Sequence, residues 1–260
     1  MAYQFIRVEL DGPVTTITLN RPEVMNAVHS PMHFEMDEAL NAFAADSGQW
    51  VGIITGAGER AFSAGNDLKH QAGGGLMRSP PSGFAGLTSR FDLTKPLIAA
   101  VNGVAMGGGF EIALACDLII ASETAIFALP EPRVGLAALA GGLHRLPQAI
   151  GVKRAMGMIL TGRRVTAREG HELGFVNEVV EPAELMAAAQ RWAALIGEAS
   201  PMSVRASKSA VMRGLDEPSL EAAIRGQGGY EAVAALFKSR DFVEGPRAFA
   251  EKRPPHWTGA

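Results

Sequence analysis

Two glutamates and a run of three glycines are the residues of this chain whose types and spacing could do chemistry. The glycines, residues 107–109, stand where an apolar segment passes into an apolar helix, and Glu111 follows in the first helical turn. Glu131 comes after a short strand and lies between two prolines. A glycine-rich helix start leaves backbone N–H groups free to point at a developing negative charge. Two carboxylates near such amides could move protons or hold a water molecule.

Each of these residues also has an ordinary structural explanation. Three glycines can form a flexible turn, Glu111 can simply favour the positive end of the helix dipole, and Glu131 can be a solvated turn residue. The position of the glycines between a strand and a helix favours a site of N–H donors. No Gly-Lys-Ser or Gly-Lys-Thr follows the run, so it is not a phosphate-binding loop of the Walker type.

A second turn of exposed amides is predicted at residues 61–68, which read Ala-Phe-Ser-Ala-Gly-Asn-Asp-Leu and follow an apolar strand. Ser63 lies in a pattern one residue short of the nucleophile elbow of serine hydrolases. The histidines after residue 70 have no clear acidic partner in the order that such a triad needs. A serine hydrolase is therefore the weaker alternative for this turn.

Three other features favour structural roles. Residues 56–61 match Gly-x-Gly-x-x-Ala after a strand, but no long helix opens there, so we predict a plain turn rather than a dinucleotide site. His29 and His33 could share a helix face, but no third ligand follows, which favours surface histidines over a metal site. Cys116, on the apolar face of its helix, is predicted to lie in the core.

Short apolar strands alternate with helices through the first half of the chain. Residues 5–10 and 14–19 are predicted to form a β-hairpin, and a Ser-Pro signal at 30–31 predicts a helix through residue 43. Further strands are predicted at 51–55, 96–101, 118–121 and 125–128, and a further helix at 109–116. Residues 70–83, rich in Gly, Pro and Ser, predict a mobile loop. This alternation is typical of an α/β fold with parallel strands.

Helical patterns dominate after about residue 140. Helices are predicted at 142–150, 152–160, 166–173, 183–198, 201–213, 217–238 and 246–252, with one strand at 176–180. We divide the chain near Ser200 into a core domain, residues 1–199, and a C-terminal helical region, residues 200–260. Apolar stripes on the late helices could pack on the core or on another subunit.

The composition is that of a globular protein: 260 residues, 47% hydrophobic and 20% charged. A net charge of −3 without a block of Lys or Arg argues against nucleic-acid binding. Neither a secretory signal nor a membrane span is expected, because the N-terminus lacks a long apolar run and no window reaches about 18 apolar residues. The single cysteine excludes an intrachain disulfide. We expect a cytoplasmic protein that needs no metal and no redox cofactor.

Several motifs in order make the sequence resemble the enoyl-CoA hydratase/isomerase (crotonase) family over essentially its whole length. They are residues 20–27, 61–68 and 95–103, the glycine run with Glu111, the Pro130-Glu131 pair, and residues 244–253. Within the family the chain is most similar to crotonobetainyl-CoA (carnitinyl-CoA) hydratases, on residues 83–88, 109–111, 127–131 and 248–253.

The resemblance implies a spiral of ββα units with a helical C-terminal region that mediates trimers, which often pair into hexamers. It implies an acyl-CoA substrate whose thioester carbonyl lies in an oxyanion hole between the backbone N–H groups of Ala64 and Gly108. It makes Glu111 and Glu131 the catalytic carboxylates. The positions that match CoA or substrate contacts are Val24, Met25, Ala27, Ala64, Gly65, Asn66, Asp67, Leu68, Phe249 and Lys252, the last two sometimes reaching a neighbouring subunit.

Retention of both glutamates favours reversible addition of water across the 2,3 double bond of a 2-enoyl-CoA thioester. We expect Glu111 to orient and deprotonate the water and Glu131 to manage the α-proton, while two amides stabilise the enolate. The alternatives are hydration of crotonobetainyl-CoA specifically, double-bond isomerisation, and a crotonase-fold binding protein without catalysis. A quaternary-ammonium acyl group would favour an aromatic or acidic cage, for which Phe84 and Phe91 are candidates.

Three residues depart from the family pattern. Ala138 stands where relatives often have proline, and Leu139 where a small residue often contacts the second glutamate. Glu23 stands where many relatives have a lysine. These departures bear on the shape of the acyl pocket, on the placement of Glu131 and on one contact to a CoA phosphate.

Overall fold

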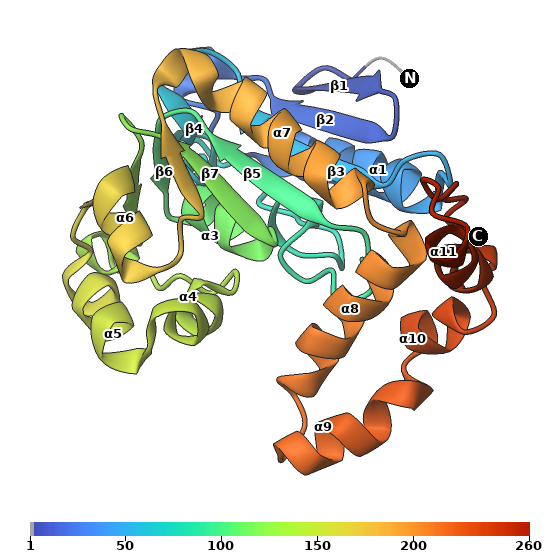
Figure 1. Cartoon of the computed structure of the whole chain (residues 1–260). Helices are drawn as coiled ribbons and strands as arrows, with labels where there is room; N and C mark the ends of the chain where they lie inside the picture. The colour runs from blue at the N-terminus through green and yellow to red at the C-terminus, as the bar shows by residue number, and fades with distance from the viewer. Residues whose placement is uncertain (1–2) are drawn as a thin grey trace.

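The computed structural model describes residues 3–260 as a mixed α/β structure whose strands form two sheets (Figure 1). The strands are β1 (Ile6–Asp11), β2 (Val14–Leu19), β3 (Val51–Gly56), β4 (Ala61–Ser63), β5 (Leu97–Val101), β6 (Val104–Met106), β7 (Leu118–Ser122), β8 (Ile126–Ala128), β9 (Val165–Thr166) and β10 (Glu178–Val180). The α-helices are α1 (Ser30–Ala45), α2 (Leu68–Ala72), α3 (Gly108–Ala115), α4 (Gly142–Ile150), α5 (Val152–Thr161), α6 (Ala167–Leu173), α7 (Leu185–Gly197), α8 (Pro201–Gly214), α9 (Leu220–Gly226), α10 (Glu231–Leu236) and α11 (Arg240–Ala250).

The chain builds the two sheets by adding strands to them in alternation. The larger sheet has the order β1-β2-β3-β5-β7-β10, and the smaller has the order β4-β6-β8-β9. From β3 to β8, successive strands alternate between the two sheets, so each turn of the chain adds one strand to each. Pairing is parallel except for β1 with β2 and β8 with β9. This alternation, with α3 following the β5–β6 pair, confirms the predicted spiral of ββα units.

The predicted hairpin at the start of the chain is present. β1 and β2 pair from Ile6 opposite Leu19 to Asp11 opposite Val14, and Gly12 takes a positive φ of 53° in the turn. Helix α1 follows, with Pro31 in its first turn, where a missing N–H costs nothing. Its buried side chains include Met36 and Leu40, so one face of the helix packs into the core.

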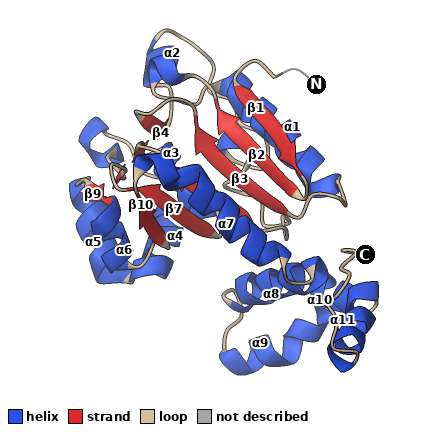
Figure 2. Cartoon of the chain, turned by 45° about the horizontal axis from the view of Figure 1, so that its top comes forward, coloured by secondary structure: helices blue, strands red, loops and turns tan. Residues whose placement is uncertain are grey.

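Apolar side chains cover both faces of the larger sheet. Helix α7 crosses one face, where its alanines pack against Val51, Ile53 and Ile98 (Figures 1 and 2). Helices α1 and α3 belong to a second and larger core cluster, with Phe110 and Phe127 among its fully buried side chains. Because β3 and β5 are buried on both faces, their sequences are continuous apolar runs rather than alternating ones.

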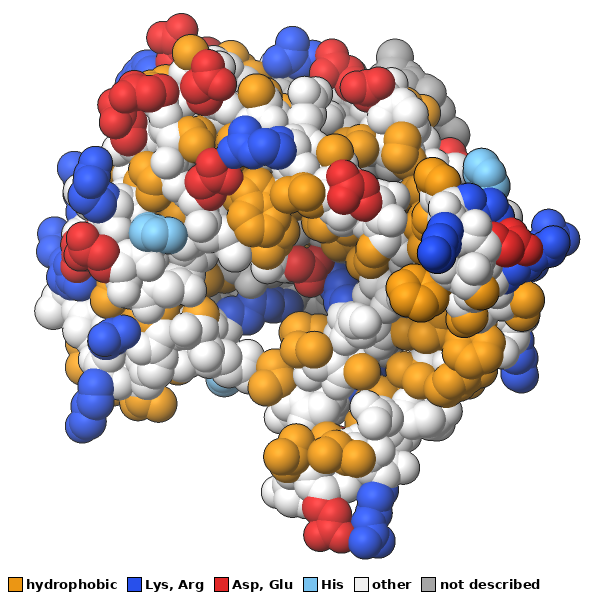
Figure 3. Space-filling view, viewed as in Figure 1, with side chains coloured by type: hydrophobic (Ala, Val, Ile, Leu, Met, Phe, Trp, Pro, Cys, Tyr) orange, Lys and Arg blue, Asp and Glu red, His pale blue; other side chains and the backbone are white. Residues whose placement is uncertain are grey.

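The helices after residue 200 form a separate group at the lower right of Figure 2. Helices α9 and α10 have no fully buried residue, and large apolar side chains of α8–α11 are exposed. In Figure 3 hydrophobic side chains gather over this part of the molecule. The exposed residues are Val211, Met212, Leu215, Leu220, Ile224, Phe237, Phe242, Val243 and Phe249. Helix α8 starts at the boundary we placed near Ser200, but the division into two domains stays a prediction.

Several elements differ from the sequence-based predictions. Residues 217–238 are not one helix, because glycines 226, 228 and 229 separate α9 from α10. The last helix begins at Arg240 rather than at 246, since Ser239 caps it by accepting a hydrogen bond from Phe242 N at 3.1 Å. The segment 70–83 begins within helix α2 before it becomes a loop. The strands β4, β6 and β9 were not predicted, because two or three residues carry no periodicity.

No helix within residues 3–260 is both long enough and apolar enough to cross a membrane.

Candidate active site

The glycine run forms the start of helix α3 and keeps one amide available. Gly107 N donates to Ala128 O at 2.9 Å, while Gly108 N has no acceptor among the described residues. A side chain at Gly109 would overlap the carbonyl oxygen of Ser63, so only glycine fits there. The predicted N–H donor at Gly108 is therefore present, and the close packing of β4 against α3 explains the third glycine.

The predicted second donor, Ala64, is already occupied. Ala64 N donates to Met25 O at 2.9 Å, which contradicts its expected role in an oxyanion hole. Two residues later, a parallel bridge between Val28 and Asn66 uses Gly65 O and Asp67 N, so Asn66 N points to the opposite side of the backbone. No acceptor within the described chain binds Asn66 N. Because Gly65 has a φ of +85°, the alternation of amide directions is broken between Ala64 and Asn66.

The turn at Gly65 and the glycine run are in contact. A Cβ added to Gly65 would lie 2.5 Å from Met106 O and 2.8 Å from Gly108 N. The amides of Asn66 and Gly108, which come from the ends of β4 and β6, therefore face a shared region. Two unpaired amides in such a place can stabilise an oxyanion.

Glu111 is 3% exposed and lies one turn above Gly108 on helix α3. Its Oε1 accepts a hydrogen bond from Gly142 N, the first residue of α4, at 2.9 Å. Burial raises the pKa of Glu111 to about 7, and the negative charge of Glu131 acts in the same direction. The Gly142 amide and the guanidinium of Arg145 oppose this rise. The carboxyl group can therefore gain or lose a proton near neutral pH.

Glu131 opens the 3-10 helix Glu131–Val134 and approaches the glycine run from the other side. A Cβ added to Gly107 would lie 2.7 Å from Glu131 Oε1, so the carboxylate rests over this glycine. Its Oε2 is buried and has no hydrogen-bond partner among the described residues. Burial raises the pKa of this carboxyl as well. A buried acceptor without a protein partner fits a position that a substrate or a water molecule completes.

The two predicted CoA-side segments lie side by side and next to the glycine run. Residues 24–27 contact residues 64–68 through the Ala64 N–Met25 O bond and the Val28–Asn66 bridge. Met25 has a positive φ of 59°, which turns the chain here. A crevice of about 50 Å³ adjoins them, lined by Pro22, Met25, Asn26 and residues 57–61.

Asp67 has a structural task within this group. Its carboxylate caps α2 by accepting from His70 N at 3.0 Å and forms an ion pair with Arg21 at 2.9 Å. Although burial opposes it, these contacts lower the pKa of Asp67. Arg21 also donates to Ala27 O, which ties residues 24–27 to the turn at Gly65. Asp67 thus holds the two segments together.

Phe249 and Lys252 are not brought to the other site residues within one chain. Phe249 is 87% exposed at the end of α11, and Lys252 follows with a positive φ of 55°. Figure 1 shows α11 far from β4 and β6, and Figure 2 shows it far from β4. Of the other predicted residues, Gly65 and Glu131 contact the glycine run, Glu111 follows it in helix α3, and residues 24–27 adjoin residues 64–68.

The geometry agrees with the comparisons with known proteins. Residues 9–260 match the family described as enoyl-CoA hydratase/isomerase. The chain belongs to the enoyl-CoA hydratase/isomerase family. It is 45% identical over 258 residues to a carnitinyl-CoA dehydratase of Salmonella arizonae, covering 98% of each chain. Among solved structures it is similar to an enoyl-CoA hydratase from Mycobacterium tuberculosis H37Rv, with a TM-score of 0.92 and 38% identity over 98% of this chain and 99% of that one. A carnitinyl-CoA hydratase from Mycobacterium avium matches with a TM-score of 0.79 and 41% identity over 100% of both chains.

Family membership confirms the resemblance seen in the sequence, and the structure removes the weaker alternatives. Ser63 Oγ is fully buried, donates to Asn26 O at 2.8 Å and accepts from Gly65 N, so it contacts backbone rather than a histidine. Residues 56–61 form the predicted turn between β3 and β4. His29 and His33 are buried rather than on the surface, which contradicts that prediction. Cys116 is half-buried against the core.

No group of three or more His, Cys, Asp or Glu side chains within residues 3–260 is placed to hold a metal ion. A cavity of about 460 Å³ lies beside α6 and β10, and its walls contain none of the predicted site residues. Of the departures from the family pattern, Ala138 is buried, and Leu139 is 81% exposed and so does not pack around Glu131.

Sequence reasoning missed three residues that act on Glu111. The backbone amides of Gly142 and Ala140 bind its carboxylate, and Arg145, three residues after Gly142, adds a positive charge nearby. The signal for Gly142 was present, because a Gly-Gly pair at 141–142 opens a helix as residues 107–109 do. For Arg145 the sequence holds no comparable signal, since its approach depends on how α4 packs on α3.

Proposed function

We propose that this protein adds water reversibly across the 2,3 double bond of a 2-enoyl-CoA thioester. The observation that carries the proposal is the presence of two carboxyl groups of raised pKa beside the open Gly108 amide: Glu131 lies over Gly107, and Glu111 follows in the first turn of helix α3. Membership of the enoyl-CoA hydratase/isomerase family supports the same activity.

In this proposal Gly108 N and Asn66 N, rather than Ala64 N, hold the thioester oxygen. Addition of water places negative charge on that oxygen as an enolate, and each preorganised amide lowers the barrier because its dipole needs no rearrangement. Loss of one such donor costs about 2.7–4 kcal/mol in a comparable enzyme. The φ of +85° at Gly65 and the close approach of this glycine to Gly108 N bring the two amides to the same region.

The two glutamates divide the proton transfers. Glu111 takes a proton from the water as its oxygen bonds to the β-carbon, and Glu131 donates a proton to the α-carbon as the enolate collapses. The pair carries one proton before and after the step, and the product gains the elements of water. Burial raises the pKa of both carboxyls, and the charge of Glu131 adds to the rise at Glu111, which favours a pair that holds one proton.

The finer substrate we propose is a carnitinyl-type acyl group, since the 45% identical relative is a carnitinyl-CoA dehydratase. The test is the loss of conjugated-thioester absorbance with crotonobetainyl-CoA and with crotonyl-CoA. Faster turnover of crotonobetainyl-CoA supports the finer proposal, and faster turnover of crotonyl-CoA assigns a general short-chain hydratase. Turnover of a 3-enoyl-CoA alone would instead identify a double-bond isomerase.

The roles of the carboxylates are tested with Glu111→Gln and Glu131→Gln. Each should lower kcat by about 100- to 10,000-fold, because one general acid or base is lost. Glu172→Gln, an exposed change on helix α6, is the matched control and should leave the rate unchanged. Hydration at the wild-type rate by either site variant would refute the assignment.

We also propose a homotrimer or a pair of trimers in the cytoplasm. The support is the exposed apolar surface of α8–α11 and the distance of Phe249 and Lys252 from the rest of their own chain's site. A neighbouring subunit would bring these residues to the CoA. Light scattering should give three or six times the 27.4 kDa chain mass, and a monomer at micromolar concentration would contradict the proposal.

A further inference from the structure

The segment at residues 82–90 is fastened firmly to helix α1. Arg90 donates to Asp37 Oδ1 at 2.8 Å, to Asn41 Oδ1 at 2.6 Å and to Gly86 O at 2.8 Å. Ser82 Oγ also donates to Asp37. Several charge-assisted hydrogen bonds on one short segment restrict its motion. Residues 82–90 are therefore a fixed part of the molecule.

Phe84 is the side chain that this segment presents to the glycine run. A Cβ added to Gly108 would lie 2.5 Å from the Phe84 ring, so the ring rests directly on the Gly108 α-carbon. Phe84 is only half-buried, whereas residues 85–88 that follow it are buried. Gly107 is covered by Glu131 in the same way. The proposed amide of Gly108 thus has a carboxylate on one side and an aromatic ring on the other.

His33 holds this ring in place from behind. Its Nδ1 accepts a hydrogen bond from Ala85 N at 2.7 Å, and its ring meets that of Phe84 edge to face at 4.6 Å between centroids. Ala85 has a positive φ of 51°, which is unfavourable for alanine and needs a compensating contact. The accepting Nδ1 requires an imidazole that carries its proton on Nε2. Burial, with His29 adding to it, lowers the pKa of His33 to about 4, so the neutral ring persists at neutral pH.

A contact from the opposite side completes the support. Thr88 Oγ1 accepts from Phe84 N at 2.9 Å, and Thr88 O accepts from Arg145 Nη2 at 2.9 Å. Arg145 also lowers the pKa of Glu111. Residues 82–90 therefore connect helix α1 to helix α4, whose first residue binds the carboxylate of Glu111.

We propose that Phe84 forms the wall of the acyl pocket and disfavours uncharged acyl chains longer than four carbons, whereas its aromatic face accepts the trimethylammonium group of a carnitinyl-type substrate, and that His33 is a positioning residue that fixes Phe84 against Gly108. This inference rests on the proposed acyl-CoA site. An acyl chain whose carbonyl oxygen binds the Gly108 amide starts beside the ring that covers the same residue. The ring thus limits the acyl chain by contact, and His33 sets where the limit lies.

The experiment compares C6 and C4 substrates, hex-2-enoyl-CoA and crotonyl-CoA. Phe84→Leu should raise the C6-to-C4 ratio of kcat/KM at least about tenfold, because a methylene in an apolar pocket is worth about 10–200-fold. His33→Leu should shift the ratio in the same direction by about 3- to 10-fold. His33→Asn, whose Oδ1 can accept from Ala85 N in place of Nδ1, should stay within about twofold of the wild type.

Phe43→Leu is the control for ordinary destabilisation, since Phe43 is a core residue near the far end of the same helix. It should lower Tm and leave the ratio unchanged. A wild-type ratio in Phe84→Leu, or a His33→Asn ratio that moves as far as that of His33→Leu, overturns the proposal. If His33→Leu does not fold, Phe84→Leu and His33→Asn still decide it.

Binding separates this inference from the proposed activity. The affinities of the unreactive thioesters butyryl-CoA and hexanoyl-CoA are measured on the same variants by calorimetry. If the wild type shows no hydratase turnover but its Phe84→Leu variant gains affinity for hexanoyl-CoA, the role of Phe84 is supported and the proposed hydration is refuted. If the wild type is a hydratase but its variants bind both thioesters with wild-type affinity, only the role of Phe84 is refuted.

Discussion

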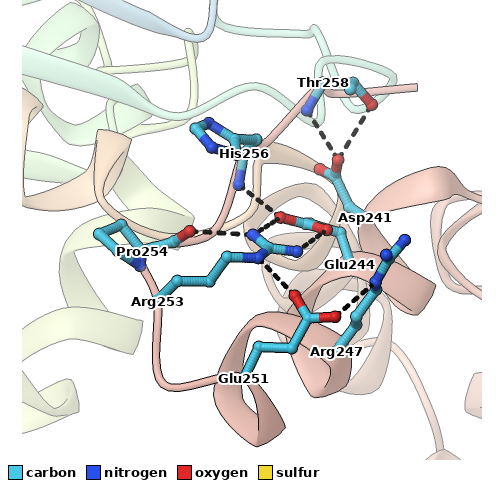
Figure 4. Close-up of polar contacts among 8 residues, drawn as sticks. All are labelled: Asp241, Glu244, Arg247, Glu251, Arg253, Pro254, His256 and Thr258. Carbon is cyan, nitrogen blue, oxygen red and sulfur yellow. Dashed lines mark hydrogen bonds and ion pairs between the residues drawn. The ribbon is translucent and has the colours of Figure 1, made fainter.

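Glu111 and Asp241 are both 3% exposed, yet burial has opposite outcomes in the two regions around them. Glu111 receives the backbone amides of Gly142 and Ala140 and faces a second carboxylate, and burial raises its pKa to about 7. Asp241, in helix α11, accepts from Ser200 Oγ, from Thr258 N and Oγ1, and from Gly259 N (Figure 4 shows the Thr258 bonds). Although burial opposes it, these hydrogen bonds lower the pKa of Asp241.

The difference teaches how the chain uses a buried charge. Around Asp241, hydrogen-bond donors replace the lost water, so the ionised carboxylate is the stable form. Its hydrogen bonds connect α11 to the start of α8 and to the C-terminal residues. Around Glu111 the replacement is incomplete, so the carboxyl exchanges its proton near neutral pH. Completed hydrogen bonding serves structure, and incomplete hydrogen bonding leaves a group that can do chemistry.

The largest effect is expected from Glu111→Gln on stability at high pH. The folded protein keeps the Glu111 proton up to about pH 7, whereas the unfolded chain loses it near pH 4.5, so the carboxyl destabilises the fold increasingly as pH rises through this window. Glutamine does not ionise, so at pH 8 the variant should be more stable by about 3 kcal/mol. Below pH 4.5 the two proteins should be equal. Urea unfolding at pH 4 and pH 8 measures the difference. Equal stability of the two proteins at pH 8 would contradict the raised pKa of Glu111.

A smaller effect of opposite sign is expected from Asp241→Asn. The amide presents N–H groups toward donors that need an acceptor, which should cost about 1–3 kcal/mol at pH 7. Because the folded pKa lies below the ordinary value of 3.8, the stabilisation by Asp241 is complete above that pH and is lost as pH falls through the folded pKa. The same unfolding series on this variant should therefore diverge from the wild type at pH 7 and converge with it at low pH. Divergence that persists at the lowest pH would show that charge has no part in it.

The smallest effect is expected from Glu244→Gln in the network of Figure 4. Arg253 binds both oxygens of Glu244 and one of Glu251, and His256 N donates to Glu244. The Arg253 hydrogen bonds, with the others, lower the pKa of Glu244 to about 2. The side chains of Arg253 and Glu251 are 30% and 44% exposed, so salt screens the network. Tm should fall slightly in dilute buffer and match the wild type in 1 M NaCl, and a fall of equal size in both would contradict the electrostatic interpretation.

Much of the fold could be predicted because burial leaves a clear mark on the sequence. The apolar runs of β3, β5 and β7 and the signals around Pro31 and Gly12 gave their elements directly. Three short strands of the smaller sheet were missed because their pairing is decided by neighbours rather than by their own residues. Pro246 suggested a helix start, yet the Ser239 cap places the start earlier, since tertiary contacts tolerate a proline within α11.

At the site, side-chain chemistry was predictable and backbone direction was not. Glu111, Glu131 and the need for glycine at 108 follow from residue type and spacing. Which amide of residues 64–66 is open depends on the Val28–Asn66 bridge and on the φ of Gly65, and neither is visible in the sequence. The burial of His33 depends in the same way on the return of residues 82–90 to α1.

The amide of Gly142 that holds Glu111 has a consequence for how such an enzyme can diversify. The groups proposed to stabilise the enolate and to orient Glu111 are main-chain amides, whereas the surface proposed to meet the acyl group is the ring of Phe84. Substitutions change side chains and leave the peptide backbone in place. Mutation can therefore explore new acyl groups at one wall while the amides that stabilise the enolate and orient Glu111 stay in place.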